Sequence, residues 1–228
     1  MKETVDRVID DYINTYELQS IFNKEIRSKF SLYTFEQGER IGDQGGPAEH
    51  LYVLVKGKVK IYTTSEEGKT LILSFKTPIE LIGDIEYVRG GSLINTVEAV
   101  STVQLLGIPY TALRKHGGDD PAFLQFLLKI ITDKFYMKSN SLNFTIMQSV
   151  EVRLASYLLS VTEDEHAKAD DKKVNLTDAS NLIGTSYRHL NRIIKKFCEE
   201  GLIERSSGGI VVKDRKGLEA LVGKSIYE

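Results

Sequence analysis

The spacing of apolar residues divides the chain into a helical start, a strand-rich middle and a helical end. In residues 1–30, apolar side chains recur every three or four positions, which is typical of amphipathic helices. From residue 32 to about residue 108, short β-branched and aromatic runs alternate with glycine-containing turns and predict strands. The predicted strands are 32–35, 51–55, 59–63, 70–75, 81–82, 96–100 and 103–108. Short strands at this spacing indicate an antiparallel β-roll of the double-stranded β-helix type, within an α+β chain.

A long helix is predicted after the strand-rich segment. Asp119 and Asp120 precede Pro121, an arrangement typical of a helix N-cap and first turn. The helical pattern continues to about residue 148, which gives a rod of about 27 residues and roughly 40 Å. Positions separated alternately by three and four residues form a coiled-coil seam, apolar in its first half and polar in its second. The seam comprises Leu128, Ile131, Phe135, Lys138, Leu142, Thr145 and Ser149.

We expect this seam to pair two copies of the chain. The apolar surface on one long helix exceeds what a single small roll would cover, and such surface is normally buried against a partner. The alternative is a helix buried within one subunit, without a dimer.

The segment after residue 150 has the order helix, tight turn, helix and β-hairpin. Gly184 suits the turn because glycine adopts a positive φ easily, and Ser186 suits the N-cap of the helix that follows. On that helix one side is apolar and the opposite side is cationic. The apolar side holds Leu190, Ile193, Ile194 and Phe197, and the cationic side holds Arg188, Arg192 and Lys195. This arrangement predicts a winged helix-turn-helix.

Charge is concentrated on this helix. The chain has 30 Lys and Arg against 32 Asp and Glu, a net charge of −2. Residues 150–228 are balanced as well, with 13 basic and 13 acidic residues. Residues 184–198, however, hold four cations and no acid. A helix with such a face fits the major groove of DNA, where an arginine can donate two hydrogen bonds to guanine.

Individual residues can be assigned roles at that interface. Arg188 and Arg192 are the expected base readers, and Tyr187 in the first turn is expected to contact a thymine methyl group or a phosphate. The expected phosphate contacts are Thr185, Ser186, His189, Lys195, Lys196, Arg205, Ser206 and Ser207. The alternative is an ordinary solvated amphipathic helix, which the hairpin and the preceding rod make less favourable.

The composition argues against several other classes of protein. The single cysteine, Cys198, cannot form an intrachain disulfide or a cysteine-rich metal site, and it fits a reducing cytoplasm. The acidic start does not resemble a secretory signal, and no uncharged run is long enough to span a bilayer. His50 lacks the His-x-His step of a metal-binding cupin, and no nucleophile elbow or P-loop occurs. We therefore expect a cytoplasmic protein without enzymatic activity, cofactor or metal.

The order of roll, long helix and winged helix-turn-helix resembles the Crp/Fnr family of bacterial transcription regulators over residues 25–215. Four segments carry the resemblance. Residues 51–62 resemble the strand-Gly-strand element of the family, and residues 81–86 resemble its "xxGE" turn. Residues 152–155 resemble the segment that opens its DNA domain, and residues 176–203 resemble its recognition unit. The helix start Ser-Tyr-Arg-His-Leu is similar to the YeiL-type branch.

The resemblance implies the organisation and the partners of the protein. It implies a cyclic-nucleotide-binding-like sensor domain over 1–118, a dimerisation helix over 119–149 and a DNA-binding domain over 150–228. It also implies a homodimer on a palindromic double-stranded operator, with RNA polymerase as a further partner if the protein is an activator. Because Tyr187-Arg188 replaces the Arg-Glu of members that read the common half-site, whereas Arg192 matches, we expect a different half-site.

The sensor also departs from the family pattern. Cyclic-nucleotide members carry Arg and Ser ten residues after the glutamate of the turn, where Leu93 and Ile94 stand here, although Arg89 and Ser92 lie nearby. Neither Leu93 nor Ile94 can neutralise a phosphate, so we expect an effector other than cAMP. The cysteines of an Fnr-type cluster are absent, and lone histidines such as His50 and His116 are seldom haem ligands.

Three alternatives stay open at this point. The effector is an anionic small molecule, or the roll is empty and DNA binding is constitutive. In a third alternative, the chain is a cyclic-nucleotide-binding or cupin-like protein that binds a small molecule and no DNA. The candidate effector pocket consists of Gly83, Asp84, Ser92, Lys138 and Ser139.

Overall fold

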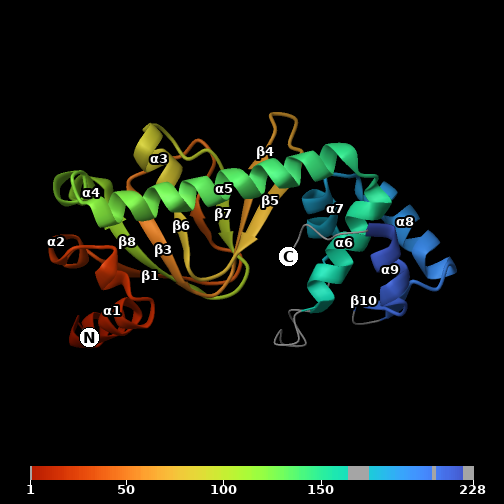
Figure 1. Ribbon diagram of the computed structural model, residues 1–228, viewed down its shortest axis with the longest axis horizontal. Coiled ribbons are helices and arrows are strands. Elements are labelled where there is room, and N and C mark those ends of the chain that lie inside the picture. The colour runs from red at the N-terminus through yellow and green to blue at the C-terminus, as the bar shows by residue number, and fades with distance from the viewer. Residues whose placement is uncertain (1, 164–174, 207–208, 223–228) are drawn as a thin grey trace. The chain divides into compact units, whose positions relative to one another are not determined.

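The computed structural model describes residues 2–163, 175–206 and 209–222. The chain forms two compact units, Met1–Phe135 and Tyr136–Glu228. Figure 1 shows the elements of each unit in chain order, from red at the N-terminus to blue at the C-terminus. Helix α5 (Pro121–Met147) begins in the first unit and ends in the second. Its length confirms the predicted rod, and the side chain of Asp120 accepts the N–H of Ala122 at 3.0 Å as its N-cap.

The first unit contains two antiparallel four-stranded sheets. The first sheet has the order β1 (Ser31–Phe35), β8 (Val103–Pro109), β3 (His50–Lys56), β6 (Glu80–Ile82). The second has the order β2 (Arg40–Gly42), β7 (Thr96–Ala99), β4 (Val59–Thr64), β5 (Thr70–Lys76). Buried side chains of both sheets, including Leu54, Leu105, Val59 and Val97, form one core between them. This arrangement confirms the predicted β-roll.

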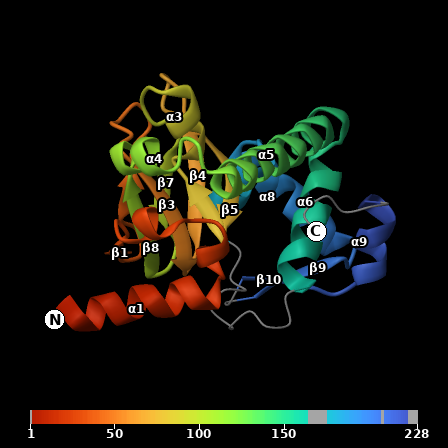
Figure 2. The same ribbon diagram turned by 60° about the vertical axis from the view of Figure 1, so that its left-hand side comes forward.

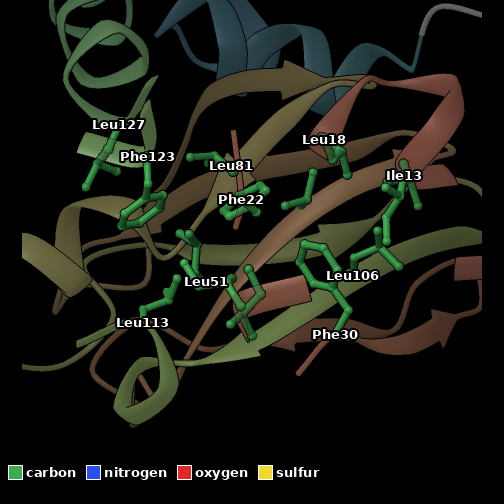
Figure 3. Packing of buried hydrophobic residues seen from close by; sticks show 14 of the residues in the cluster. Ile13, Leu18, Phe22, Phe30, Leu51, Leu81, Leu106, Leu113, Phe123 and Leu127 are labelled. Atoms are coloured by element: carbon green, nitrogen blue, oxygen red, sulfur yellow. The ribbon is translucent and has the colours of Figure 1, made fainter. Parts of the chain in front are cut away.

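Alternation along β3 divides its side chains between two cores. Because neighbouring strand residues point to opposite faces, Leu54 faces the other sheet, whereas Leu51 and Val53 face the helical side. There they meet Phe22 and Phe123, whose ring centroids are 5.6 Å apart. Figure 3 shows Leu51 and Phe123 beside Phe22, which is fully buried. The second core holds the start of α5 against the roll.

The N-terminal helical region consists of three short elements rather than one continuous helix. Helix α1 (Lys2–Thr15) is followed by a 3₁₀ turn, η1 (Leu18–Ser20), and by α2 (Lys24–Arg27). Glu17 has a left-handed backbone with φ of 51°, which ends the first helix. The hydroxyl of Tyr12 donates to Gln104 near the start of β8, and that of Tyr16 donates to the carbonyl of Val55 near the end of β3. Helix α1 therefore packs against this end of the first sheet (Figure 2).

The strand-rich segment also contains elements that periodicity did not predict. These are β2 and two short helices, α3 (Asp84–Arg89) and α4 (Tyr110–His116). Each is too short to show a clear helical or strand period, and tertiary burial stabilises the helices. Tyr110 and Leu113 are buried on α4, and Asp84 and Glu86 are buried on α3.

The second unit has the predicted winged helix-turn-helix arrangement. Helices α6 (Val150–Glu163), α7 (Leu176–Ile183) and α8 (Tyr187–Glu199) precede the antiparallel hairpin of β9 (Ile203–Ser206) and β10 (Gly209–Val212). A final helix, α9 (Arg215–Val222), was not predicted; its buried Leu218 joins the core of the unit. That core also contains Leu158, Ile183, Leu190, Ile194 and Phe197.

Candidate nucleic-acid interface

Local capping fixes the turn between α7 and α8. The side chain of Asn175 accepts the N–H groups of Thr177 and Asp178 at 3.0 and 3.2 Å and starts α7. Gly184 ends α7 with φ of 71°, a conformation that glycine adopts without strain. The hydroxyl of Ser186 accepts the N–H of His189 at 3.2 Å and starts α8. The predicted turn at Gly184 and the predicted N-cap at Ser186 are therefore confirmed.

The two sides of α8 differ as the sequence predicts. Leu190, Ile193, Ile194 and Phe197 are buried in the core of the second unit, and the small residue Ala179 of α7 is fully buried with them. On the other side, Arg188, Arg192, Lys195 and Lys196 are exposed. The unit therefore presents the cationic side of α8 to solvent.

The four cations of α8 differ in how they are paired. Lys195 Nζ lies 3.7 Å from a carboxylate oxygen of Glu199. Lys196 Nζ lies 2.9 Å from Glu151 of α6, and this hydrogen bond raises the pKa of the Lys196 ammonium. Within the described part of the chain, Arg188 and Arg192 make neither an ion pair nor a hydrogen bond. These two guanidinium groups keep all their donors available for a ligand.

The N-terminal end of α8 carries the remaining predicted contacts. Tyr187 is 52% exposed in the first turn, and Ser186 is exposed beside it. Thr185 and His189 are half-buried, with Thr185 Oγ1 3.4 Å from His189 Nδ1. Free backbone N–H groups at a helix N-terminus favour an anion such as a phosphate. The contacts assigned to this end from the sequence stay predictions.

The hairpin is joined to α8 through a residue that was not among the predicted contacts. Arg205 of β9 is exposed, and its Nη2 donates to Oδ1 of Asn191 on α8. Ser206 is the last residue of β9, and Ser207 lies outside the described residues. Asn191 has no role among the contacts predicted from the sequence.

A buried arginine of α6 contacts the turn between α7 and α8. Arg153 of α6 is 8% exposed, and its Nη1 donates to the carbonyl of Ile183, the last residue of α7. A cation at a helix C-terminus is favourable because carbonyl groups there lack intrahelical partners. The sequence indicated residues 152–155 as the opening of this domain but gave no partner for Arg153.

In the first unit, two of the candidate effector residues lie at a buried ion cluster. Gly83 has φ of 88° and starts α3, and Asp84 is 3% exposed. Lys134 of α5 places its Nζ 2.9 and 3.0 Å from the two oxygens of Asp84 and 3.1 Å from Glu80. Asp84 therefore has a cation partner from its own unit, which sequence reasoning missed.

The other candidate effector residues are more accessible. Ser92 is exposed in the first unit. Lys138 is exposed and Ser139 is half-buried on the part of α5 that belongs to the second unit.

The predicted seam on α5 is largely exposed in the single chain. Leu128, Phe135 and Leu142 are 66%, 72% and 59% exposed. Ile131 is half-buried against the core of the first unit. The exposed members recur along one helix and present unpaired apolar surface.

The described residues contain neither a metal-binding cluster nor a membrane-spanning helix. No cluster of three or more His, Cys, Asp or Glu side chains among the described residues could hold a metal ion. His50 is half-buried and stacks on Tyr52, with ring centroids 5.7 Å apart. No described helix is long and apolar enough to cross a membrane.

Family models match both units in the same order as the structure. Residues 32–116 match the cyclic nucleotide-binding domain, and residues 152–221 match the Crp-like helix-turn-helix domain. The first match covers the roll from β1 to α4, and the second covers α6 to α9.

Individual proteins are similar to this chain over most of its length. The regulatory protein YeiL of Escherichia coli O157:H7 is 28% identical over 204 residues, which are 88% of this chain and 89% of that protein. A CRP-like cAMP-activated global transcriptional regulator of Mycobacterium tuberculosis is 23% identical over 81% of this chain and 84% of its own length. A crp/fnr-family transcriptional regulator from Eubacterium rectale has a TM-score of 0.81 and 21% identity over 92% of this chain and 100% of that one.

These relatives are transcription regulators rather than enzymes, and the Eubacterium rectale structure has the fold described above. Helix α8 is thus the second helix of a Crp-like helix-turn-helix domain, and the chain belongs to the Crp/Fnr family of transcription regulators.

Proposed function

We propose that two copies of this chain bind a palindromic operator and that each inserts α8 into the major groove of one half-site. The observation that carries this proposal is the pair of exposed, unpaired guanidinium groups of Arg188 and Arg192, opposite the buried stripe of the same helix. With one reading helix per copy, the half-sites are expected about one helical turn, roughly 34 Å, apart. Tyr187 is the third base contact of the proposal.

The phosphate contacts in this proposal surround the base readers. Thr185, Ser186 and His189 lie at the start of α8, Arg205 lies on β9, and Lys195 and Lys196 lie on α8. Ser206 and Ser207 complete the proposed set. The ion pairs of Lys195 and Lys196 are at exposed positions, so exchanging a carboxylate for a DNA phosphate costs little.

The same proposal assigns pairing of the copies to the seam of α5. Leu128, Phe135 and Leu142 expose large apolar side chains in the single chain, and such surface is stabilised when a second copy covers it. Family members act as dimers, which supports this assignment.

The sensor is proposed to bind an effector other than cAMP near Gly83, Asp84 and Ser92. Leu93 and Ile94 offer no cation to a cyclic phosphate, and the N–H of Ile94 already donates to the buried Glu86 carboxylate at 3.0 Å. Asp84 is held by Lys134. If the regulator is an activator, RNA polymerase is its further partner.

Selection of bound sequences from random duplex DNA, repeated with and without metabolite extract, tests the operator and the effector together. Enrichment of an inverted repeat by the wild-type protein is the expected result. Absence of any enriched sequence under both conditions would reject the proposed function.

Exchanging Arg192 for Ala is expected to weaken operator binding by about 1–3 kcal/mol, because one bidentate contact to a base is lost. Fluorescence anisotropy with the selected operator measures the change, and the selected sequence should become degenerate at one position of each half-site. Arg114→Ala removes an exposed arginine from α4 in the first unit and serves as the matched control. Equal affinities of the two variants would show that Arg192 does not read a base.

A further inference from the structure

The side chain of Asn191 links the recognition helix to the wing. Its Nδ2 donates to the carbonyl of Tyr187, one turn earlier on α8, at 3.0 Å. Its Oδ1 accepts from Nη2 of Arg205 on β9. Asn191 is half-buried and Arg205 is exposed. Both ends of the carboxamide therefore have partners, one on each element.

The orientation of this carboxamide is determined by its partners. A backbone carbonyl only accepts hydrogen bonds, so it must face the NH₂ group. A guanidinium only donates, so it must face the oxygen. Flipping the amide would place donor against donor and acceptor against acceptor, and both hydrogen bonds would be lost. The bond to Tyr187 consequently holds Oδ1 of Asn191 towards β9.

The contact also restricts Arg205. A free arginine side chain samples many rotamers, and ordering it on binding costs free energy. A guanidinium has five N–H donors, so one bond to Asn191 leaves the others available for a phosphate. Arg205 of β9 is thereby kept beside α8, the helix that carries Arg188 and Arg192.

We propose that Asn191 is a positioning residue that orients Arg205 for a phosphate contact, so that the wing strand and the recognition helix bind the DNA backbone as one unit. This inference rests on the proposed function of α8. It makes Asn191 distinct from the base readers, because both ends of its carboxamide are already engaged within the protein, one with α8 and one with β9.

A double-mutant cycle on the full-length chain tests the proposal. Asn191→Ala, Arg205→Ala and the double variant are compared on the selected operator over a range of salt concentrations. We expect each single variant to bind roughly tenfold more weakly, because an ordered charge-assisted contact is lost. The double variant should bind no more weakly than Arg205→Ala. Each variant should also reduce the slope of log K against log salt by about one, as loss of a single phosphate contact does.

The sequence preference separates positioning from base reading. The operator selected by Asn191→Ala should be the same as that of the wild type. Additive losses in the cycle, or an altered preference at one base pair, would assign Asn191 a base contact and overturn the proposal. Wild-type affinity and salt slope in Asn191→Ala would overturn it as well.

Two controls check the folding of the variant and the specificity of the salt effect. Alanine has a higher helix propensity than asparagine, so α8 is expected to form in the variant, which circular dichroism checks. Lys216→Ala removes an exposed cation of α9 and should leave the salt slope unchanged. If the wild-type protein selected no operator, the proposed function itself would fail, an outcome separate from those of the cycle.

Discussion

Replacing Lys134 by methionine is expected to lower the free energy of unfolding by about 3–5 kcal/mol, because it leaves the buried Asp84 carboxylate without its cation. The Lys134 ammonium donates to the carbonyl of Leu81 at 2.7 Å and to Asp84 at 2.9 and 3.0 Å. The Lys134 side chain is only 14% exposed and that of Asp84 only 4%. Methionine keeps the unbranched stem, so the loss reports the charge rather than packing. Urea unfolding followed by circular dichroism measures it.

Lys129→Met provides the matched control on the same helix. Lys129 pairs with Asp133 at 2.6 Å, but both side chains are exposed, at 72% and 59%. Such surface pairs contribute about 0–1 kcal/mol. Similar losses in the two variants would show that the Lys134 cluster contributes no more than a surface pair.

Acidification should reveal the same cluster. Burial raises the pKa of the Glu80 carboxyl, but the charges and hydrogen bonds of Lys134 and Lys76 lower it by more, so that it lies below its ordinary value. A carboxyl whose pKa is lowered in the folded state stabilises the fold at pH values above its ordinary pKa. This contribution is lost as the pH falls through the lowered pKa. Lys134→Met should therefore lose less further stability in acid than the wild type. A steeper acid loss in the variant would contradict this interpretation.

The recognition unit could be predicted from the sequence because its determinants are local. A glycine at the end of α7, a serine at the start of α8 and an apolar stripe at spacings of three and four lie within one short segment. The long helix and the longer strands were predictable for the same reason, since each repeats its period several times.

Contacts between distant parts of the sequence were not predictable in this way. Lys134 and Asp84 are 50 positions apart, and Arg153 and the Ile183 carbonyl are 30 positions apart. Lys134 occurs in a helix with other charged residues, so the sequence does not show that it is buried. The pairing of Arg205 with Asn191 likewise depends on how the hairpin folds back on α8.

Exchanging Leu142 for Asp is expected to convert the proposed homodimer into monomers. Leu142 is 59% exposed in the single chain and lies on the polar half of the seam, where fewer apolar contacts hold the copies together. Symmetry places the substitution on both helices. Each copy then loses about 1.5–3 kcal/mol of apolar burial and gains an unpaired carboxylate at the interface. Sedimentation velocity measures the mass directly.

Asn140→Asp is the matched control for this variant. Asn140 is exposed and lies two positions away, which is about 200° around the same helix. It adds the same charge outside the seam and should leave the dimer intact. Operator affinity should fall only in Leu142→Asp, because a monomer presents one reading helix and loses the second half-site. The masses of Leu142→Asp and Asn140→Asp should differ only if the copies pair through this face of α5. A dimeric mass for Leu142→Asp, or a monomeric wild type, would therefore reject the seam.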